Sequence, residues 1–133
     1  MNHENKISQK VIGASIEVHK TLSGPGLLES VYEEALCFEL EILGLSAQRQ
    51  VYLPIQYKGK KLGTPLRIDL LVEKRVIVEV KSTAEINPIF KAQLLTYLRL
   101  SDLQLGLLIN FGNSTLKEGI TRIINSAPSA PLR

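Results

Sequence analysis

Three charged residues interrupt two apolar, strand-like runs near the middle of this 133-residue chain. Asp69 lies within 67–72, and Glu79 and Lys81 lie within 76–81. A charge in such a run costs free energy unless something on that face of the strand needs it. Because Glu79 and Lys81 are two residues apart, they share one face of a strand. Two carboxylates with an ammonium beside them could form a magnesium-dependent site for phosphodiester cleavage.

An antiparallel hairpin would allow the two carboxylates to meet. If Asp69 lies directly opposite Glu79, Val72 pairs with Val76 and a loop of three residues joins the strands. The Lys81 ammonium could then orient an attacking water or stabilise charge that develops on the phosphate. The alternative is a solvent-facing ladder of cross-strand ion pairs, and the spacing alone does not choose between the two.

Two of the predicted helices carry further polar candidates. Glu29 and Glu33 are four residues apart near the start of a helix, so their side chains project together. Their alternative role is to stabilise the helix N-terminus through its dipole. Gln93 and Tyr97 are also four apart, and such a pair can position a phosphate or a base, or form an ordinary polar flank.

The spacing of apolar residues predicts the elements that must position these side chains. Three helices are predicted, over 7–22, 28–42 and 88–101. On the second helix, the predicted buried stripe consists of Leu28, Val31, Ala35, Phe38 and Ile42. Strands are predicted over 50–57, 67–72, 76–81 and 105–111. The segment 119–124 is either a last short strand, which we favour, or a helical turn. Pro54 favours a sheet-edge position or a bulge for the first strand. This order predicts an α/β fold, a mixed β-sheet flanked by helices.

Composition limits the class of protein. Hydrophobic and charged contents of 44% and 22% are ordinary for a globular protein. We expect a single domain over 1–125 and a disordered tail over 126–133. The polar N-terminus and the lack of a long apolar run predict a cytoplasmic protein without membrane contact. One cysteine, Cys37, excludes an internal disulfide and four-cysteine metal sites, and is expected to be a buried hydrophobe.

His19 is expected at a helix surface or flank.

The charge balance permits nucleic-acid binding without requiring it. The formal net charge is +3 and the pI is about 9.1. Basic clusters at 58–61 and 74–75 fall where turns are expected, so each is either a solvated turn or an edge that contacts phosphates. An edge strand over 50–57 would also allow a homodimer.

Several segments carry a resemblance to a known family. Asp69 followed by Glu79-Val80-Lys81 resembles the core motif of the PD-(D/E)XK nuclease superfamily, and 93–97 resembles the QxxxY element of its RecB-like branch. More closely, the chain is similar to the family of GxxExxR proteins. The segments that carry this second resemblance are 24–33, 57–60, 69–72, 78–81 and 92–97.

The resemblance implies a restriction-endonuclease-like fold with Asp69, Glu79 and Lys81 in the active site. It implies Mg²⁺ or Mn²⁺ bound by Asp69, Glu79, the carbonyl of Val80 and an acid from the N-terminal helix. Glu29 is the better candidate for that acid, and Glu33 is the reserve.

Gln93 and Tyr97 are implied to act at the same site. Two departures from the family pattern concern Ile68, where the superfamily has a proline, and Tyr32, where the name motif counted from Gly26 has its arginine. The implied function is a metal-dependent nuclease that acts on DNA. The alternative is a non-catalytic module that binds nucleic acid or protein on the same scaffold.

Overall fold

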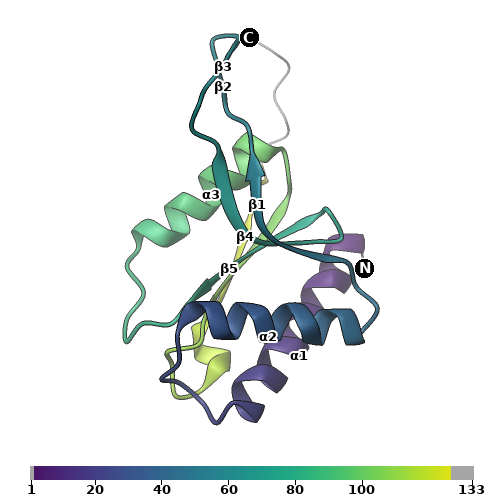
Figure 1. The fold of residues 1–133 in the computed structure, drawn as a ribbon, viewed down its shortest axis with the longest axis vertical. Helices are drawn as coiled ribbons and strands as arrows, with labels where there is room; N and C mark the ends of the chain where they lie inside the picture. The colour runs from purple at the N-terminus through teal and green to yellow at the C-terminus, as the bar shows by residue number, and fades with distance from the viewer. Residues whose placement is uncertain (1, 127–133) are drawn as a thin grey trace.

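A computed structural model describes residues 2–126, which form a mixed sheet with helices on both faces (Figure 1). The elements are α1 (His3–Thr21), α2 (Glu29–Ile42), β1 (Ala47–Leu53), β2 (Gln56–Tyr57), β3 (Lys60–Lys61), β4 (Leu66–Val72), β5 (Val76–Lys81), α3 (Ile89–Ser101), β6 (Leu105–Asn110), the 3₁₀ turn η1 (Leu116–Gly119) and β7 (Ile120–Ile124). The predicted tail at 126–133 lies outside the described residues apart from Ser126. No helix among the described residues is long and apolar enough to cross a membrane.

The five-stranded sheet has the order β1-β4-β5-β6-β7. Strands β5 and β6 are parallel, and the other neighbouring pairs are antiparallel. A parallel pair needs a long crossover connection, and here α3 lies within it. The predicted mixed α/β fold is therefore confirmed. The remaining strands, β2 and β3, form a separate two-stranded hairpin between β1 and β4.

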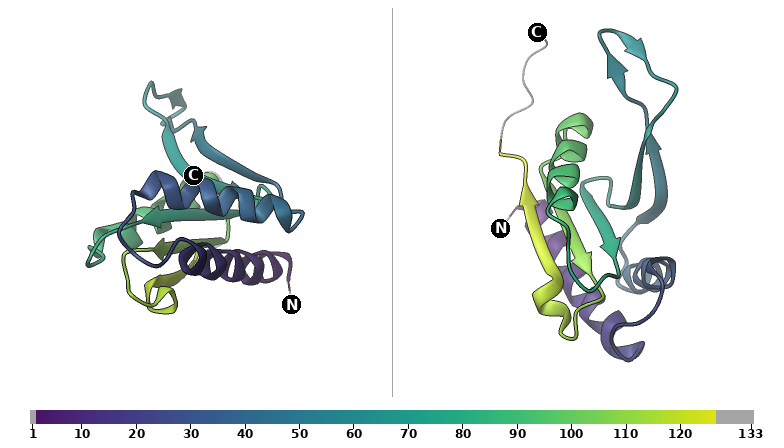
Figure 2. Two further views of the ribbon diagram at one scale, coloured as in Figure 1. Left: turned by 60° about the horizontal axis from the view of Figure 1, so that its bottom comes forward. Right: turned by 90° about the vertical axis from the view of Figure 1, so that its left-hand side faces the viewer.

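The two faces of the sheet have separate hydrophobic cores. Helices α1 and α2 cover one face and α3 covers the other (Figure 2). Helix α1 buries four apolar residues at helical spacing on the first face, Ile7, Val11, Ala14 and Val18. On the second face, α3 packs closely over Gly106 of β6, where a Cβ atom would come within 2.9 Å of the Leu94 side chain.

The predicted buried stripe of α2 is wrong. Leu28, Phe38 and Ile42 are 73%, 64% and 61% exposed, whereas Tyr32 and Leu36 are fully buried. Apolar residues lie around most of this helix, so the helical repeat is compatible with burial of either the predicted stripe or the stripe that contains Tyr32 and Leu36. The Tyr32 stripe is buried because the aromatic ring stacks on Phe111 with a centroid distance of 4.5 Å. Cys37 lies beside this stripe and is buried, as predicted.

The predicted strand over 50–57 is divided in two. Strand β1 ends at Leu53, and Pro54 lies in the break before β2, at the edge of the sheet as expected. The last predicted strand is confirmed as β7.

The expectation that His19 lies at a helix surface or flank is corrected. His19 is 7% exposed, and its Nε2 lies 3.0 Å from the carbonyl oxygen of Asn113. It therefore joins α1 to the loop after β6 instead of facing solvent.

Candidate active site

The β4–β5 hairpin has the register that the sequence predicts. Val72 pairs with Val76 and Leu70 pairs with Val78, so the connecting loop has three residues. This loop contains no glycine, and Glu73 and Lys74 adopt left-handed backbone conformations with φ of 53° and 56°. The same register brings Asp69 opposite Glu79, one position beyond the last ladder pair.

The two carboxylates are linked through the backbones of the strands. The Asp69 N–H donates to Oε2 of Glu79 at 2.9 Å, and the Val80 N–H donates to Oδ2 of Asp69 at 2.9 Å. Each carboxylate thus fills the place of a ladder hydrogen bond, and no residue among 2–126 bonds to the second oxygens, Oδ1 and Oε1. This arrangement fixes the two side chains next to each other and leaves one oxygen of each for a ligand.

A break in the neighbouring ladder turns Asp69 toward α2. Strands β1 and β4 pair on both sides of Gln50 and Asp69 but not at these two residues, and Gln50 has a φ of 52°. The alternation of β4 shifts at this point. Ile68 belongs to the core under α3, whereas Leu70 belongs to the core under α1 and α2. Such an irregularity locally redirects side chains, as bulges beside active sites do.

Asp69 opens into a cleft between the sheet and the start of α2. The cleft has a volume of about 480 Å³ and is lined by residues that include Glu29, Glu33, Gln50, Arg67, Asp69 and Val80. Glu29 is exposed on its rim, whereas Glu33 is 4% exposed within its wall. Both candidate helix acids therefore face the same cleft as Asp69.

The start of α2 is held against this cleft by three hydrogen bonds. The Tyr32 hydroxyl donates to the carbonyl of Gly24 at 2.7 Å and accepts the Leu27 N–H at 3.2 Å. The Ser82 hydroxyl, just after β5, donates to the carbonyl of Leu27 at 2.7 Å. Gly24 and Gly26 have φ values of 92° and 116°, which other residues rarely adopt. The Gly-Pro-Gly segment therefore brings the first turn of α2 to the end of β5.

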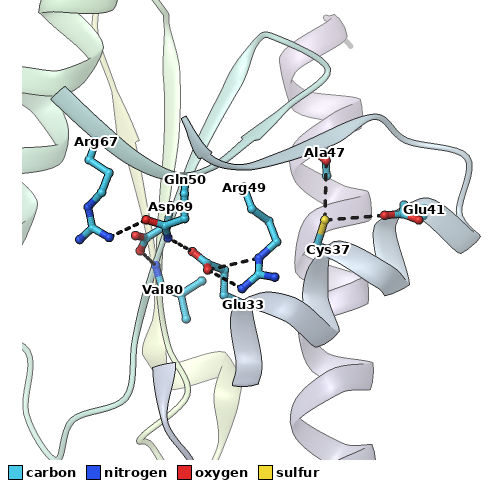
Figure 3. A network of polar contacts seen from close by, with 9 residues as sticks. All are labelled: Glu33, Cys37, Glu41, Ala47, Arg49, Gln50, Arg67, Asp69 and Val80. Carbon is cyan, nitrogen blue, oxygen red and sulfur yellow. Dashed lines mark hydrogen bonds and ion pairs between the residues drawn. The ribbon is translucent and has the colours of Figure 1, made fainter. Parts of the chain in front are cut away.

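Glu33 is engaged in a network along one wall of the cleft (Figure 3). Its Oε2 accepts from the Arg49 guanidinium at 3.0 Å, and its Oε1 accepts from Nε2 of Gln50 at 2.6 Å. Gln50 in turn accepts a hydrogen bond from Arg67. Burial with two strong donors makes Glu33 a structural residue of the wall, while the exposed Glu29 carries no such partners among the described residues.

Glu79 is the most strongly perturbed acid of the site. It is 6% exposed, and burial raises its pKa from 4.5 to about 8, helped by the negative charge of Asp69. Lys81 and Arg67 favour the ionised form, but their effect on the pKa is smaller. Burial is the larger cause, so poor solvation of the carboxylate, more than repulsion from Asp69, disfavours the ionised form of Glu79. A bound cation would offset both effects, because an opposite charge nearby favours an ionised carboxylate.

The α3 side of the site holds Lys81 and the Gln93–Tyr97 pair. The Lys81 ammonium lies 4.1 Å from the centre of the Phe90 ring. Gln93 donates from Nε2 to the Tyr97 hydroxyl at 3.1 Å, as their spacing predicts. Burial raises the pKa of Tyr97, and the negative charge of Glu79 raises it further, which places this hydroxyl within electrostatic reach of the site.

The structure brings together Asp69, Glu79 and Val80, with Lys81 on the face of Glu79. It does not gather a closer cluster, since residues 2–126 contain no group of three or more His, Cys, Asp or Glu side chains arranged to hold a metal ion. Sequence analysis missed Arg67 and Gln50, which both line the cleft. Arg67 could have been found, because it is a charged residue two positions before Asp69 on the same strand. The left-handed backbone at Gln50 has no sequence signal.

This chain has the restriction-endonuclease-like fold, a five-stranded mixed sheet with three helices, and it carries Asp69 on β4 and Glu79 and Lys81 on β5. The chain matches the family described as the PD-(D/E)XK nuclease superfamily over residues 5–123, and it belongs to that superfamily. Members of this superfamily typically use divalent metal ions and act on nucleic acid.

A solved structure supports the fold assignment. The crystal structure of SSO0001 is similar with a TM-score of 0.52 and 21% sequence identity, over 74% of this chain and 50% of that chain. This chain therefore spans about half the length of that protein, and the similarity shows the fold alone. No curated protein matches the chain.

Proposed function

We propose that this protein is a nuclease that hydrolyses phosphodiester bonds in DNA with the help of Mg²⁺ or Mn²⁺. The observation that carries the proposal is the interlocked pair of Asp69, which lines the cleft, and Glu79, which is buried beside it, with a lysine two residues beyond Glu79 on the same face. Membership of the nuclease superfamily supports the reaction class.

Asp69, Glu79 and the carbonyl of Val80 are the groups that would hold the metal ion. Oxygen donors of this kind suit Mg²⁺, and a cation beside the two carboxylates would offset both the burial and the repulsion from Asp69 that raise the pKa of Glu79. When bound, the ion would polarise the phosphoryl group and acidify a water. Glu29 is the helix acid best placed to contribute, because it is exposed on the cleft rim and Glu33 is occupied by Arg49.

The cations of the site have separate proposed roles. Lys81 would orient the attacking water or stabilise charge on the phosphate, since its compact ammonium lies on the Glu79 face. Arg67 lines the cleft beside Asp69, and its guanidinium suits a neighbouring phosphate. The Gln93–Tyr97 pair on α3 would contact the nucleotide on the other side of the scissile bond.

We also propose that the chain belongs to the GxxExxR proteins within the superfamily. Support comes from the segment 24–33, which holds the start of α2 at the cleft and contains both candidate helix acids. The arginine of the name motif is replaced by Tyr32, which serves here in packing against Phe111.

A cleavage assay with single-residue variants tests the proposed function. Wild-type protein should nick or degrade some form of DNA with Mg²⁺ or Mn²⁺, and chelation of the ion should stop it. Asp69→Asn, Glu79→Gln and Lys81→Ala should each abolish cleavage, whereas the exposed control Glu118→Gln should not. Metal-dependent cleavage that survives both carboxylate changes would come from a contaminant and would overturn the assignment.

One observation favours a second candidate, a non-catalytic module that binds nucleic acid or protein. This observation is the lack, within 2–126, of a group of three acids close enough to hold a metal. Calorimetric titration of Mg²⁺ into wild type and Asp69→Asn separates the candidates. Absence of Mg²⁺ binding in the presence of DNA would favour the binding module.

A further inference from the structure

The stretch of chain that includes β1 and its connection to β4 carries basic residues and no acidic ones. From Gly44 to Ile68 the chain has five basic residues and no Asp or Glu. Three of the five lie in the β2–β3 hairpin, and all three are exposed: Lys58, Lys60 and Lys61. We call residues 54–65, which contain this hairpin, the basic arm.

The basic arm extends away from the body of the protein. Figures 1 and 2 show it continuing the β1–β4 ribbon beyond the sheet, with no helix packed against it. Lys58 and Gly59 have φ values of 49° and 82°, the two consecutive left-handed residues of a tight hairpin turn. Only two residue pairs join β2 to β3. A two-stranded hairpin of this size gains little stability from its own packing. The projecting arm therefore contributes little to the stability of the fold, which favours a role in binding.

Each strand pair of this ribbon places a tyrosine opposite a basic residue. Tyr57 pairs with Lys60 in the arm, and Tyr52 pairs with Arg67 next to the cleft. The two tyrosines are 60% and 63% exposed, which is unusual for such large aromatic rings. Opposed residues of an antiparallel pair share a face, so each ring lies beside a cation. Aromatic rings beside cations are the groups that hold single-stranded nucleic acid, by stacking on bases and pairing with phosphates.

The opposite wall of the cleft has the reverse charge. Two of the five glutamates of α2, Glu29 and Glu33, line the cleft, and the helix contains no lysine or arginine. Because Glu33 is paired with Arg49, a strand of phosphates that enters the cleft is repelled chiefly by Glu29 and attracted along the β1–β4 ribbon. Arg67 lies on β4 and lines the cleft, so it is the basic residue at which the β1–β4 ribbon meets the cleft.

We propose that the basic arm binds a single strand of nucleic acid that leads away from the cleft. Lys58, Lys60 and Lys61 would contact its phosphates, and Tyr57 and Tyr52 would stack on its bases. The inference rests on the proposed nuclease function for its substrate class, and it adds a preference for substrates with a single-stranded tail. From Arg67 to Lys61 the ribbon spans about 20 Å at about 3.3 Å per residue. An extended single strand spaces its phosphates roughly twice as widely as the 3.4 Å rise of duplex DNA, so the tip of the arm meets a phosphate about three nucleotides from the cleft.

Binding can be measured apart from cleavage, by fluorescence anisotropy with labelled oligothymidylates and a chelator present. One probe has about 20 nucleotides and the other about 2, too short to extend from the cleft to the tip of the arm. The arm variant combines Lys58→Gln, Lys60→Gln and Lys61→Gln. The matched control makes the same change in charge at three exposed lysines elsewhere, Lys6→Gln, Lys10→Gln and Lys74→Gln.

The arm variant should lose about tenfold or more in affinity for the long probe, and the slope of log affinity against log salt should fall by about 2. Tyr57→Ala should weaken the same probe by at least about fivefold. Neither change should affect the short probe, and circular dichroism should show that the fold is intact.

Three results would overturn the inference: an equal loss in the lysine control, unchanged binding in the arm variant, or an arm-dependent preference for duplex over single strand. Wild-type protein that binds no nucleic acid at low salt would also overturn it and would point to a protein partner for the arm. Arm-dependent binding without cleavage would leave the inference standing and remove the nuclease function. Cleavage of short substrates without arm-dependent binding would leave the nuclease function standing and overturn the inference about the arm.

Discussion

Asp69 and Glu79 each accept a hydrogen bond from the backbone of the other's strand, at 2.9 Å in both cases. This reciprocal arrangement makes the two acids part of the sheet as well as part of the site. It also holds two negative charges close together in a partly buried place, which is costly unless a proton or a cation is present. The stability of the protein should therefore respond both to pH and to divalent metal.

The first prediction concerns pH in metal-free buffer. The pKa of Glu79 is raised from 4.5 to about 8 in the folded protein, so the folded state binds a proton that the unfolded state has lost. The free energy of unfolding should therefore fall as pH rises between about 4.5 and 8, by at most about 1.4 kcal/mol per pH unit. Glu79→Gln cannot ionise and should remove most of this slope. Urea unfolding across the pH range provides the measurement, and an equal slope in both proteins would refute the prediction.

The second prediction concerns Mg²⁺. Because the ion would bind the folded state only, adding it should raise the melting temperature, and the gain should grow with concentration. Glu29→Gln should reduce this gain, whereas Glu34→Gln, an exposed neighbour on α2, should leave it intact. Differential scanning fluorimetry with and without Mg²⁺ measures both. Equal gains in wild type and Glu29→Gln would leave Glu33 as the helix acid.

The third prediction concerns how Lys81 is held. Its ammonium lies 4.1 Å from the centre of the Phe90 ring, a contact of about 0.5–1 kcal/mol at a partly exposed site. Phe90→Leu keeps an apolar side chain but removes this attraction, and it should lower the cleavage rate by about two- to fivefold without changing DNA affinity. Single-turnover cleavage measures the rate. A wild-type rate in Phe90→Leu would mean that the ring does not position the lysine.

The fourth prediction tests which side of α2 is buried. Leu36→Ala removes a fully buried side chain and should lower the free energy of unfolding by about 2–5 kcal/mol. Phe38→Ala removes a larger side chain that is 64% exposed, and it should change stability by less than about 1 kcal/mol. Chemical denaturation compares the two variants. A larger loss in Phe38→Ala would restore the stripe that the sequence suggested.

The sequence was sufficient for the parts of the site that depend on local patterns. The register of the β4–β5 hairpin followed from placing Asp69 opposite Glu79, and the contact of Gln93 with Tyr97 followed from helical spacing. Both depend on residues close in the chain, whose relation is set by the repeat of one element. The superfamily match over most of the chain agrees with these patterns.

Features that depend on distant contacts could not be predicted. Apolar residues on two sides of α2 left its buried face undecided until Phe111 of another segment stacked on Tyr32. The burial of His19 likewise depends on Asn113, 94 residues further along the chain. The backbone break at Gln50, which turns Asp69 toward the cleft, involves no glycine or proline at that residue and so left no trace in the sequence.

Gly106, which lies under α3, sets how closely this helix packs on the sheet. A Cβ atom at position 106 would come within 2.9 Å of the Leu94 side chain, so α3 and this leucine pack closely on the sheet where Gly106 has no side chain. Gln93 and Tyr97 lie on that helix, and Glu79 lies on the sheet below. A residue with a side chain at position 106 would require Leu94 or α3 to shift away from the sheet. Variants at this position would therefore change the distance between the α3 side of the site and Glu79 without replacing any of the proposed reacting groups.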